Sequence, residues 1–331
     1  MALSGVAPAF DPALAALAGR VTALARRVSL AHAIAPTNWD DELARLVAAR
    51  RRGGRPPPAF VHTAQADGDA IADELSVIAE LLAGGTPLAR TIAARAAEVG
   101  LEARLAAAVG TPRLVALARV RYTSSSADDA RARRWAKAYR DDDGDEATTA
   151  SEDEGDPASL VSAMRRAVGE RRLAVRVVVR TGMAARAATG DGVVVVAAGH
   201  RLRSREVART VVHELDGHVA PLLARRAAMG PFAFRPAGDA DREEGAALVC
   251  ERAAGLLDGG RKRELALRHV AACLAHDGAP FHDVVDELAS LGAGATAAVR
   301  LSARAMRGGG LGRERVYLPA YWAACRTAAV R

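Results

Sequence analysis

The sequence predicts an α+β fold that is predominantly helical, with a small sheet. Apolar residues recur at three- and four-residue spacing through most of the chain, which is typical of helices that bury one face. Two short runs rich in valine, at residues 173–179 and 193–197, predict strands instead. The chain has 331 residues and half of them are hydrophobic. It can therefore bury a substantial core, and disorder as its main state is excluded.

Residues 1–140 form a predicted N-terminal region that is mainly helical. Helical periodicity runs through three segments of it, at residues 12–34, 66–82 and 87–120. Thr37 or Asn38 is placed to cap a further helix, because three acidic residues follow and suit the positive end of a helix. Glycines and prolines at residues 53–58 end that helix.

Residues 141–156 carry nine acidic residues and no basic one, which predicts a solvated linker or loop. Residues 157–331 form the predicted catalytic region, which we expect to make one compact unit with the N-terminal region. This region begins with a helix near 158–168, contains the two predicted strands, and is helical again from residue 204. We also expect the strand at 192–197 to offer an edge that pairs with a substrate backbone.

The charge pattern argues against nucleic acid as a partner. The net charge is +7, from 46 basic and 39 acidic residues. A basic chain could attract nucleic acid, but no basic patch is interleaved with aromatic residues and no nucleic-acid motif is present. Arginine, which dominates the basic residues, equally suits a pocket for a carboxylate, because its planar fork donates to two oxygens at once.

No segment predicts a membrane partner or export. The longest strongly apolar run, at residues 193–198, is far shorter than the ~20 residues of a spanning helix. No charged start precedes a long apolar stretch, so we expect no secretory signal. Cys250, Cys273 and Cys325 are too widely spaced to form a disulfide scaffold. We therefore expect a cytoplasmic protein, and the sequence does not predict its oligomeric state.

The sharpest signal is the motif His213-Glu214-x-x-x-His218. In zinc proteases two histidines four residues apart leave one helix face, and a glutamate between them serves as a base. Here the spacing is five, which at 100° per residue would place the imidazoles about 140° apart on a regular α-helix. A π-turn, with ~4.4 residues per turn, would bring the two imidazoles within roughly 50° of each other around the helix axis. Gly217 lowers the steric cost of such a turn. If both histidines bind one ion, this helix must be irregular between them.

A third ligand is needed, since two histidines alone could equally face solvent or pack on an ordinary helix. A second predicted helix opens near Arg242 and supplies a carboxylate. Glu244 is the candidate, and it shares a helical face with Glu251, seven residues on. Glu243 competes with it and would point elsewhere. Two histidines and one glutamate would favour zinc and leave a fourth position for water.

These motifs resemble a known family. Residues 213–218 and the Glu-Glu-Gly-Ala-Ala segment at 243–247 are similar to the H-E-x-x-x-H and Q-E-G-L-A pair of the tyrosine carboxypeptidase family. That family includes the microtubule-associated tyrosine carboxypeptidases and bacterial flavohemoglobin expression-modulating QEGLA-motif proteins. Further segments resemble its P-T-N-x-x-x-E, R-x-x-R-G-G and K-D-x-V-Y-L stretches, at residues 35–42, 304–309 and 313–318. The resemblance spans about residues 35–320, except the acidic segment.

The resemblance implies a gluzincin-like site beside the small sheet, in a zinc-dependent metallocarboxypeptidase. Its substrate would be a peptide or protein C-terminus, with tyrosine or phenylalanine as candidate residues. Zn²⁺ would be held by His213, His218 and Glu244. Glu214 would take the proton of the attacking water, and Tyr317 would donate to the oxyanion. One or two of three arginines would bind the terminal carboxylate: Arg304, Arg307 and Arg313.

Departures from the family pattern keep other functions open. Glu243 replaces the motif's glutamine, Ala246 replaces its leucine, and Arg313-Glu314 replaces its Lys-Asp pair. One alternative is a different metal-dependent amide hydrolase on the same scaffold. The other is a non-catalytic regulatory or binding protein, in which metal is structural or absent.

A second metal site is conceivable further along the chain. His269, Cys273 and His276 stand at four- and seven-residue spacing, so they share one helical face. A face of this kind usually serves packing, and we expect packing here.

Overall fold

The fold is α+β and predominantly helical, as the sequence predicts, and its strands form two small sheets where one was expected. It is seen in a computed structural model, which describes residues 11–139, 147–183, 185–190, 192–229 and 235–329. None of the helices in these ranges combines the length and the apolar character that a membrane crossing requires.

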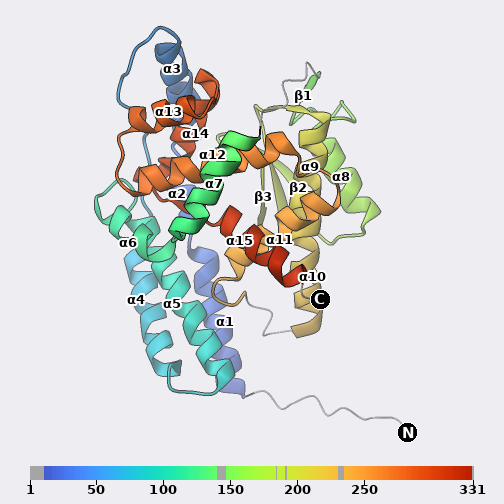
Figure 1. The fold of residues 1–331 in the computed structure, drawn as a ribbon. Helices are drawn as coiled ribbons and strands as arrows, with labels where there is room; N and C mark the ends of the chain where they lie inside the picture. The colour runs from blue at the N-terminus through green and yellow to red at the C-terminus, as the bar shows by residue number, and fades with distance from the viewer. Residues whose placement is uncertain (1–10, 140–146, 184, 191, 230–234, 330–331) are drawn as a thin grey trace.

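Three N-terminal helices form a bundle that extends away from the sheets (Figure 1), namely α1 Pro12–Arg27, α4 Gly68–Leu82 and α5 Pro87–Ala107. The side chains of Asp11 and Thr86 cap α1 and α5, and a proline follows each cap, where its missing N–H costs nothing. Leu24, Leu75 and Ile92 are fully buried between the helices. The bundle is therefore held by an apolar core of its own.

Four shorter helices continue this region: α2 Leu30–Ala33, α3 Trp39–Arg51, α6 Arg113–Arg121 and α7 Ser126–Ala138. The segment predicted as one helix at 12–34 is thus divided after Arg27. α3 begins directly after Asn38, as expected, but the Asn38 side chain does not cap it. Its amide donates to the carbonyl of Ala59 (2.9 Å) and accepts from the N–H of Val61 (2.8 Å). The motif that resembles P-T-N-x-x-x-E therefore fastens an extended stretch of chain to α3.

A three-stranded sheet lies in the middle of the sequence, with the strand order β2-β4-β3. Its strands are β2 Arg176–Arg180, β3 Ala187–Gly190 and β4 Val193–Ala197. The prediction of a strand at 193–197 is confirmed, β2 begins later than predicted, and β3 was not predicted. β4 pairs in parallel with β2 and antiparallel with β3. The expectation that β4 offers a free edge is therefore wrong, because both of its edges are occupied.

The second half of the predicted acidic linker is partly ordered. Thr148–Ala150 form strand β1, which pairs antiparallel with β5 Arg201–Arg203. Ser151 is fully buried, and its hydroxyl donates to the carbonyl of Ala197 at 2.6 Å. Residues 148–150 are therefore a strand and not a loop, because Thr148–Ser151 carry no acidic side chain and their backbone pairs with β5. Residues 140–146 lie outside the described ranges.

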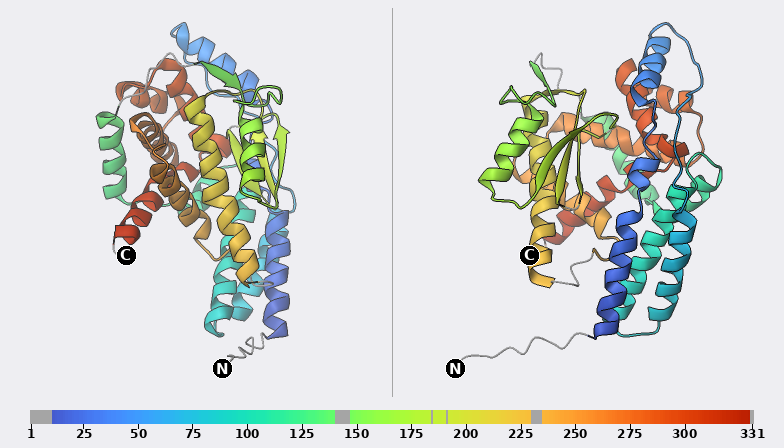
Figure 2. Two further views of the ribbon diagram at one scale, coloured as in Figure 1. Left: turned by 90° about the vertical axis from the view of Figure 1, so that its right-hand side faces the viewer. Right: turned by 180° about the vertical axis from the view of Figure 1, so that it is seen from behind.

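Two helices cover the three-stranded sheet, α8 Leu160–Glu170 and α9 Ser204–Glu214 (Figure 2). Leu160 and Met164 of α8 are fully buried against Val194 and Val196 of β4. The alternation along β4 explains this, since a strand points every second residue to the same face. α9 then continues through a π-turn, Leu215–Val219, into α10 Ala220–Met229. The sheet thus fixes the start of the helix that carries the H-E-x-x-x-H motif.

The C-terminal part supplies the remaining helices: α11 Asp239–Ala253, α12 Gly259–His276, α13 Phe281–Ser290, α14 Ala295–Ala305 and α15 Tyr317–Ala329. Two short 3-10 turns, Arg307–Gly309 and Arg313–Arg315, join α14 to α15. Leu265, Val285 and Trp322 belong to the core of this part, together with Leu46 of α3. One apolar core therefore joins the two regions that the sequence separated at the acidic segment.

Candidate metal centre

The helix that carries the H-E-x-x-x-H motif is irregular where the motif requires it. Leu215–Val219 form a π-turn between the two histidines. As a result the Nε2 atoms of His213 and His218 lie 3.3 Å apart, and both side chains are mostly buried. The prediction that this helix departs from α geometry is confirmed.

Gly217 has a second reason to be glycine besides tolerance of the π-turn. A Cβ atom at Gly217 would lie 2.3 Å from the Cβ of Ala247 on α11. On the same helix, a Cβ at Gly245 would lie 2.4 Å from the carbonyl of Ala320 on α15. The two glycines let three helices approach closely, and this packing brings α11 against the π-turn.

Glu244 of α11 completes a cluster with the two histidines. Its Oε2 lies 3.4 Å from Nε2 of His213 and 3.6 Å from Nε2 of His218, and one donor atom from each residue lies within 4.8 Å of the others. Among the described residues this buried oxygen has no hydrogen-bond partner. Burial alone would raise the pKa of Glu244, but the two imidazoles hold it well below its ordinary value. A buried anionic oxygen facing two imidazole nitrogens fits a divalent cation.

Glu243, the competing candidate, has other partners. Its carboxylate lies 3.1 Å from Arg225 and 2.8 Å from Arg235, and its approach to His218 is 4.0 Å, on the Nδ1 side. The geometry therefore brings Glu244, and not Glu243, to the two Nε2 atoms.

Glu251 orients the first histidine from behind. Its Oε1 lies 2.8 Å from Nδ1 of His213, and Arg261 of α12 holds the same carboxylate at 3.0 and 3.1 Å. Burial would raise the pKa of Glu251, but Arg261 and His213 lower it to about 2. An imidazole that bonds a carboxylate through Nδ1 presents Nε2 to the other side, which is the usual support of a metal-binding histidine.

Glu214 lies beside the cluster and is 8% exposed. Its Oε2 accepts a hydrogen bond of 2.5 Å from the hydroxyl of Thr189 on β3. Thr189 carries no signal in the sequence, because β3 is short and lacks the valines that mark the other two strands. Edge strand β3 thus fixes one oxygen of Glu214.

Tyr317 opens α15, and its ring lies under the guanidinium of Arg268, 4.8 Å from the ring centroid. Burial, with the nearby carboxylates of Glu244 and Glu314, raises the pKa of Tyr317 to about 12. The phenol is therefore protonated at neutral pH and can donate a hydrogen bond.

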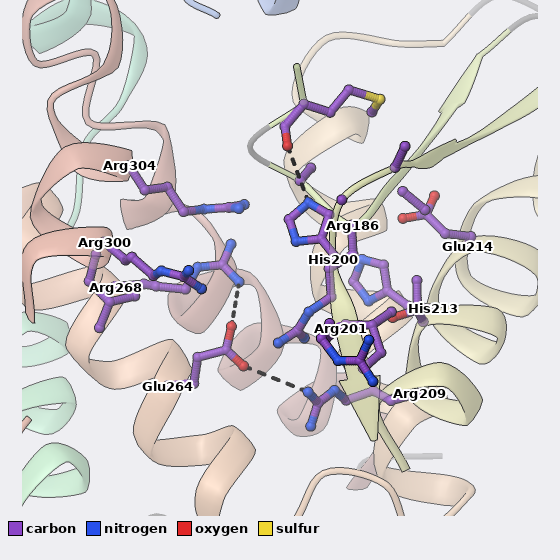
Figure 3. Close-up of a pocket in the computed structure, with 18 of the residues that line it drawn as sticks. Arg186, His200, Arg201, Arg209, His213, Glu214, Glu264, Arg268, Arg300 and Arg304 are labelled. Atoms are coloured by element: carbon purple, nitrogen blue, oxygen red, sulfur yellow. Dashed lines mark hydrogen bonds and ion pairs between the residues drawn. The ribbon is translucent and has the colours of Figure 1, made fainter. Parts of the chain in front are cut away.

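A cavity of about 520 Å³ lies beside these groups, and His213, Glu214 and Tyr317 are in its wall. Figure 3 shows His213 and Glu214 on one side and Arg300 and Arg304 on the other. The wall is rich in arginine, namely Arg186, Arg201, Arg209, Arg261, Arg268, Arg300 and Arg304. Its carboxylates are fewer, namely Asp40, Glu214, Glu251 and Glu264. The cavity therefore favours an anionic ligand.

The three arginines predicted to bind substrate occupy different places. Arg304 lines the cavity, with its Nε donating to Glu314 at 2.8 Å. Arg307 and Arg313 are not among the lining residues. Arg307 lies 3.4 Å from the buried Glu314, and Arg313 lies 3.6 Å from Oε1 of Glu244.

Arg300 is a cavity residue that the sequence interpretation missed. It precedes Arg304 by four residues on α14, so both side chains leave the same helical face. The four-residue spacing from Arg304 could therefore have indicated Arg300 as a second arginine of the cavity. Among the described residues Arg300 has no ion-pair partner, unlike Arg304.

One known family matches the chain. The model of the family described as microtubule-associated tyrosine carboxypeptidase matches residues 50–328, which is most of the chain. The chain therefore belongs to this family, and it is a peptidase of the carboxypeptidase type. No curated protein and no solved structure matches it.

Proposed function

We propose that this protein is a zinc-dependent carboxypeptidase that hydrolyses the last peptide bond of a peptide or protein. The observation that carries the proposal is the convergence of His213, His218 and Glu244, whose donor atoms lie within 4.8 Å of one another beside an arginine-rich cavity. Two nitrogen donors and one carboxylate are a ligand set typical of catalytic zinc.

Zinc would be held by Nε2 of both histidines and by Glu244, whose Oε2 has no other partner in the described chain. A zinc ion in such a site acidifies water and polarises a scissile carbonyl. Glu251 keeps Nε2 of His213 directed at the cluster by binding its Nδ1. Arg313, 3.6 Å from Glu244 Oε1, would hold the second oxygen of the same carboxylate.

Glu214 would act as the general base. One of its oxygens is fixed by Thr189, and the side chain faces the cavity beside His213. The carboxylate would take a proton from the attacking water and return it to the leaving amine. Tyr317, protonated because its pKa is about 12, would donate a hydrogen bond to the oxygen on which negative charge develops.

Arg304 and Arg300 would recognise the terminal carboxylate. Both lie in the cavity wall opposite Glu214 (Figure 3), so a substrate bound by its C-terminus would place its last peptide bond between them and the base. A guanidinium and a carboxylate form paired hydrogen bonds, which also fix the orientation of the substrate. We propose tyrosine, which the family description names, as the first residue to test, and phenylalanine as the second.

The direct test uses purified protein, metal analysis and a panel of peptides. The peptides end in tyrosine, phenylalanine, alanine or glutamate, each with a free and an amidated C-terminus, and products are identified by mass spectrometry. We expect one zinc ion in the cluster, and loss of a single residue from free C-termini only. Equal cleavage of free and amidated peptides would favour the alternative amide hydrolase. Zinc-loaded protein without any cleavage would overturn the proposal.

A further inference from the structure

A second cluster of metal-type side chains lies away from the cavity, between α7 and α12. Asp129 of α7 meets His269 and Cys273 of α12. Asp129 Oδ1 lies 2.8 Å from Nε2 of His269 and 3.3 Å from Sγ of Cys273. One donor atom from each residue lies within 4.8 Å of the others, as at the first cluster.

The sequence indicated His269, Cys273 and His276 as a possible metal-binding group. In the structure the first two lie together, but His276 is not the third residue of the cluster. His276, expected on the same face, packs its ring against Gly312 instead, where an added Cβ would lie 2.7 Å from Nδ1. Asp129 takes its place from a helix 140 residues away in sequence. A sulfur, an imidazole nitrogen and a carboxylate oxygen from two helices are all ligands that zinc accepts.

The surroundings hold these donors in place. His269 is fully buried and Cys273 is 8% exposed, and their four-residue spacing puts both on one face of α12. Ser124 donates to Asp129 Oδ1 at 2.5 Å, and Arg315 donates to Ser124 at 2.9 Å. Arg315 also lies 3.9 Å from the other oxygen, Oδ2, which leaves Oδ1 directed at the histidine and the cysteine.

We propose that this cluster binds a second divalent transition-metal ion through Asp129 Oδ1, His269 Nε2 and Cys273 Sγ. The chemistry of these donors favours zinc, and the bound ion would link α7 to α12. The Asp129 side chain is 31% exposed, so an ion and a water ligand can reach the cluster from that side. On binding, the thiol of Cys273 loses its proton to solvent and the sulfur binds as thiolate, because a coordinating thiol is deprotonated by the metal.

The competing explanation is a purely hydrogen-bonded contact, in which His269 and Cys273 both donate to the Asp129 carboxylate. The two explanations differ in the state of the sulfur. Only metal binding gives a metal–thiolate bond, and the cluster of His213, His218 and Glu244 contains no sulfur. A metal–thiolate signal therefore cannot come from the first cluster, and its loss in a Cys273 variant assigns it to this one.

Cobalt(II) provides that signal, because a cobalt–thiolate bond has a charge-transfer band in the near ultraviolet that nitrogen and oxygen ligands lack. The metal-free full-length protein is titrated with Co²⁺. We expect two bound equivalents and the thiolate band. Cys273→Ser should lose the band and one equivalent, whereas Cys250→Ser, a matched control outside the cluster, should keep both.

A further variant separates this proposal from the proposed peptidase site. His213→Ala/His218→Ala should lose one equivalent and keep the full thiolate band. The absence of the band in wild-type protein at saturating cobalt would overturn the proposal and leave a hydrogen-bonded contact. A band that survives Cys273→Ser would also overturn it, because the sulfur would then come from Cys250 or Cys325.

Discussion

Glu251 Oε1 lies 2.8 Å from Nδ1 of His213, on the side of the imidazole that faces away from Glu244. Glu244 and Glu251 stand seven residues apart on α11, so they lie on one face of the helix. That face supplies both a candidate metal ligand, Glu244, and the carboxylate that orients His213. Because Glu251 is also held by Arg261, the orientation of His213 depends on a carboxylate that is itself fixed. A carboxylate that orients an imidazole in this way is typical of metal-binding histidines, which favours the proposed role of the cluster.

Glu251→Gln should weaken metal binding without removing a ligand. The neutral amide no longer favours the required imidazole tautomer, and loss of such a supporting group typically costs about 10- to 100-fold in metal affinity. Competition with a chelator measures the change. Glu170→Gln, the same substitution at an exposed helix end, should leave the affinity unchanged. Equal affinities for wild type and Glu251→Gln would contradict the supporting role.

Glu251 should also make the metal-free protein sensitive to acid. Its pKa is lowered to about 2 in the folded chain, against about 4.3 in the unfolded chain. The stabilisation is therefore fully present above pH ~4.3 and is lost as the pH falls towards 2, with a size of about 2–3 kcal/mol. Denaturant unfolding between pH 2 and 6 should show a shallower pH dependence for Glu251→Gln than for wild type. Parallel curves would refute this assignment.

Glu214→Gln should separate metal binding from catalysis. The amide retains the shape of the side chain but cannot take a proton, and loss of a general base typically lowers kcat by about 10²- to 10⁴-fold. Metal content should stay at the wild-type level, because Glu214 is not in the cluster of donor atoms. Full activity in a zinc-loaded Glu214→Gln protein would eliminate Glu214 as the base.

Gly217→Ala should disturb the contact between the π-turn and α11. The new methyl group would lie 2.3 Å from the Cβ of Ala247, and overpacking of this kind costs about 1–3 kcal/mol. The free energy of unfolding and the metal affinity should both fall. Gly169→Ala is the matched control, because nothing lies within 4 Å of its added Cβ, and it should stabilise α8 by about 0.4–1 kcal/mol. Equal changes in unfolding free energy and metal affinity for the two variants would show that the close approach of Gly217 to Ala247 does not stabilise the site.

Arg300→Gln and Arg304→Gln should each impair cleavage of peptides with a free C-terminus. A hydrogen bond to a charged group contributes about 1.5–3 kcal/mol, so kcat/KM should fall on the order of 10- to 100-fold. Arg304→Gln should also destabilise the fold, because it leaves Glu314 with one fewer partner. Arg90→Gln, on the distant α5, is the control. An unchanged kcat/KM in both variants would move carboxylate recognition to other arginines.

Much of the first cluster could be predicted because its constraints are local. The five-residue spacing of His213 and His218 is compatible with a shared ion only if the helix is irregular, and the π-turn follows from that requirement. Glu244 could be predicted as the third ligand because it lies in a second motif, Glu-Glu-Gly-Ala-Ala, within a single helix. The valine-rich run at 193–197 predicted β4 because β-branched residues are typical of buried strands.

Features set by long-range packing could not be predicted. β3 carries Thr189 but has the sequence Ala-Ala-Thr-Gly, and only pairing with β4 makes it a strand. Arg307 shares a motif with Arg304, yet its direction depends on where the buried Glu314 lies. The meeting of Asp129 with His269 depends on how α7 packs on α12, and no periodicity encodes that contact.

The most direct test of the central claim is a zinc-bound crystal structure with anomalous diffraction at the zinc absorption edge. We expect an anomalous peak about 2.0–2.2 Å from Nε2 of His213, Nε2 of His218 and a carboxylate oxygen of Glu244. Zinc that bound only elsewhere, or a pair of imidazoles turned away from Glu244 at full zinc occupancy, would contradict the account.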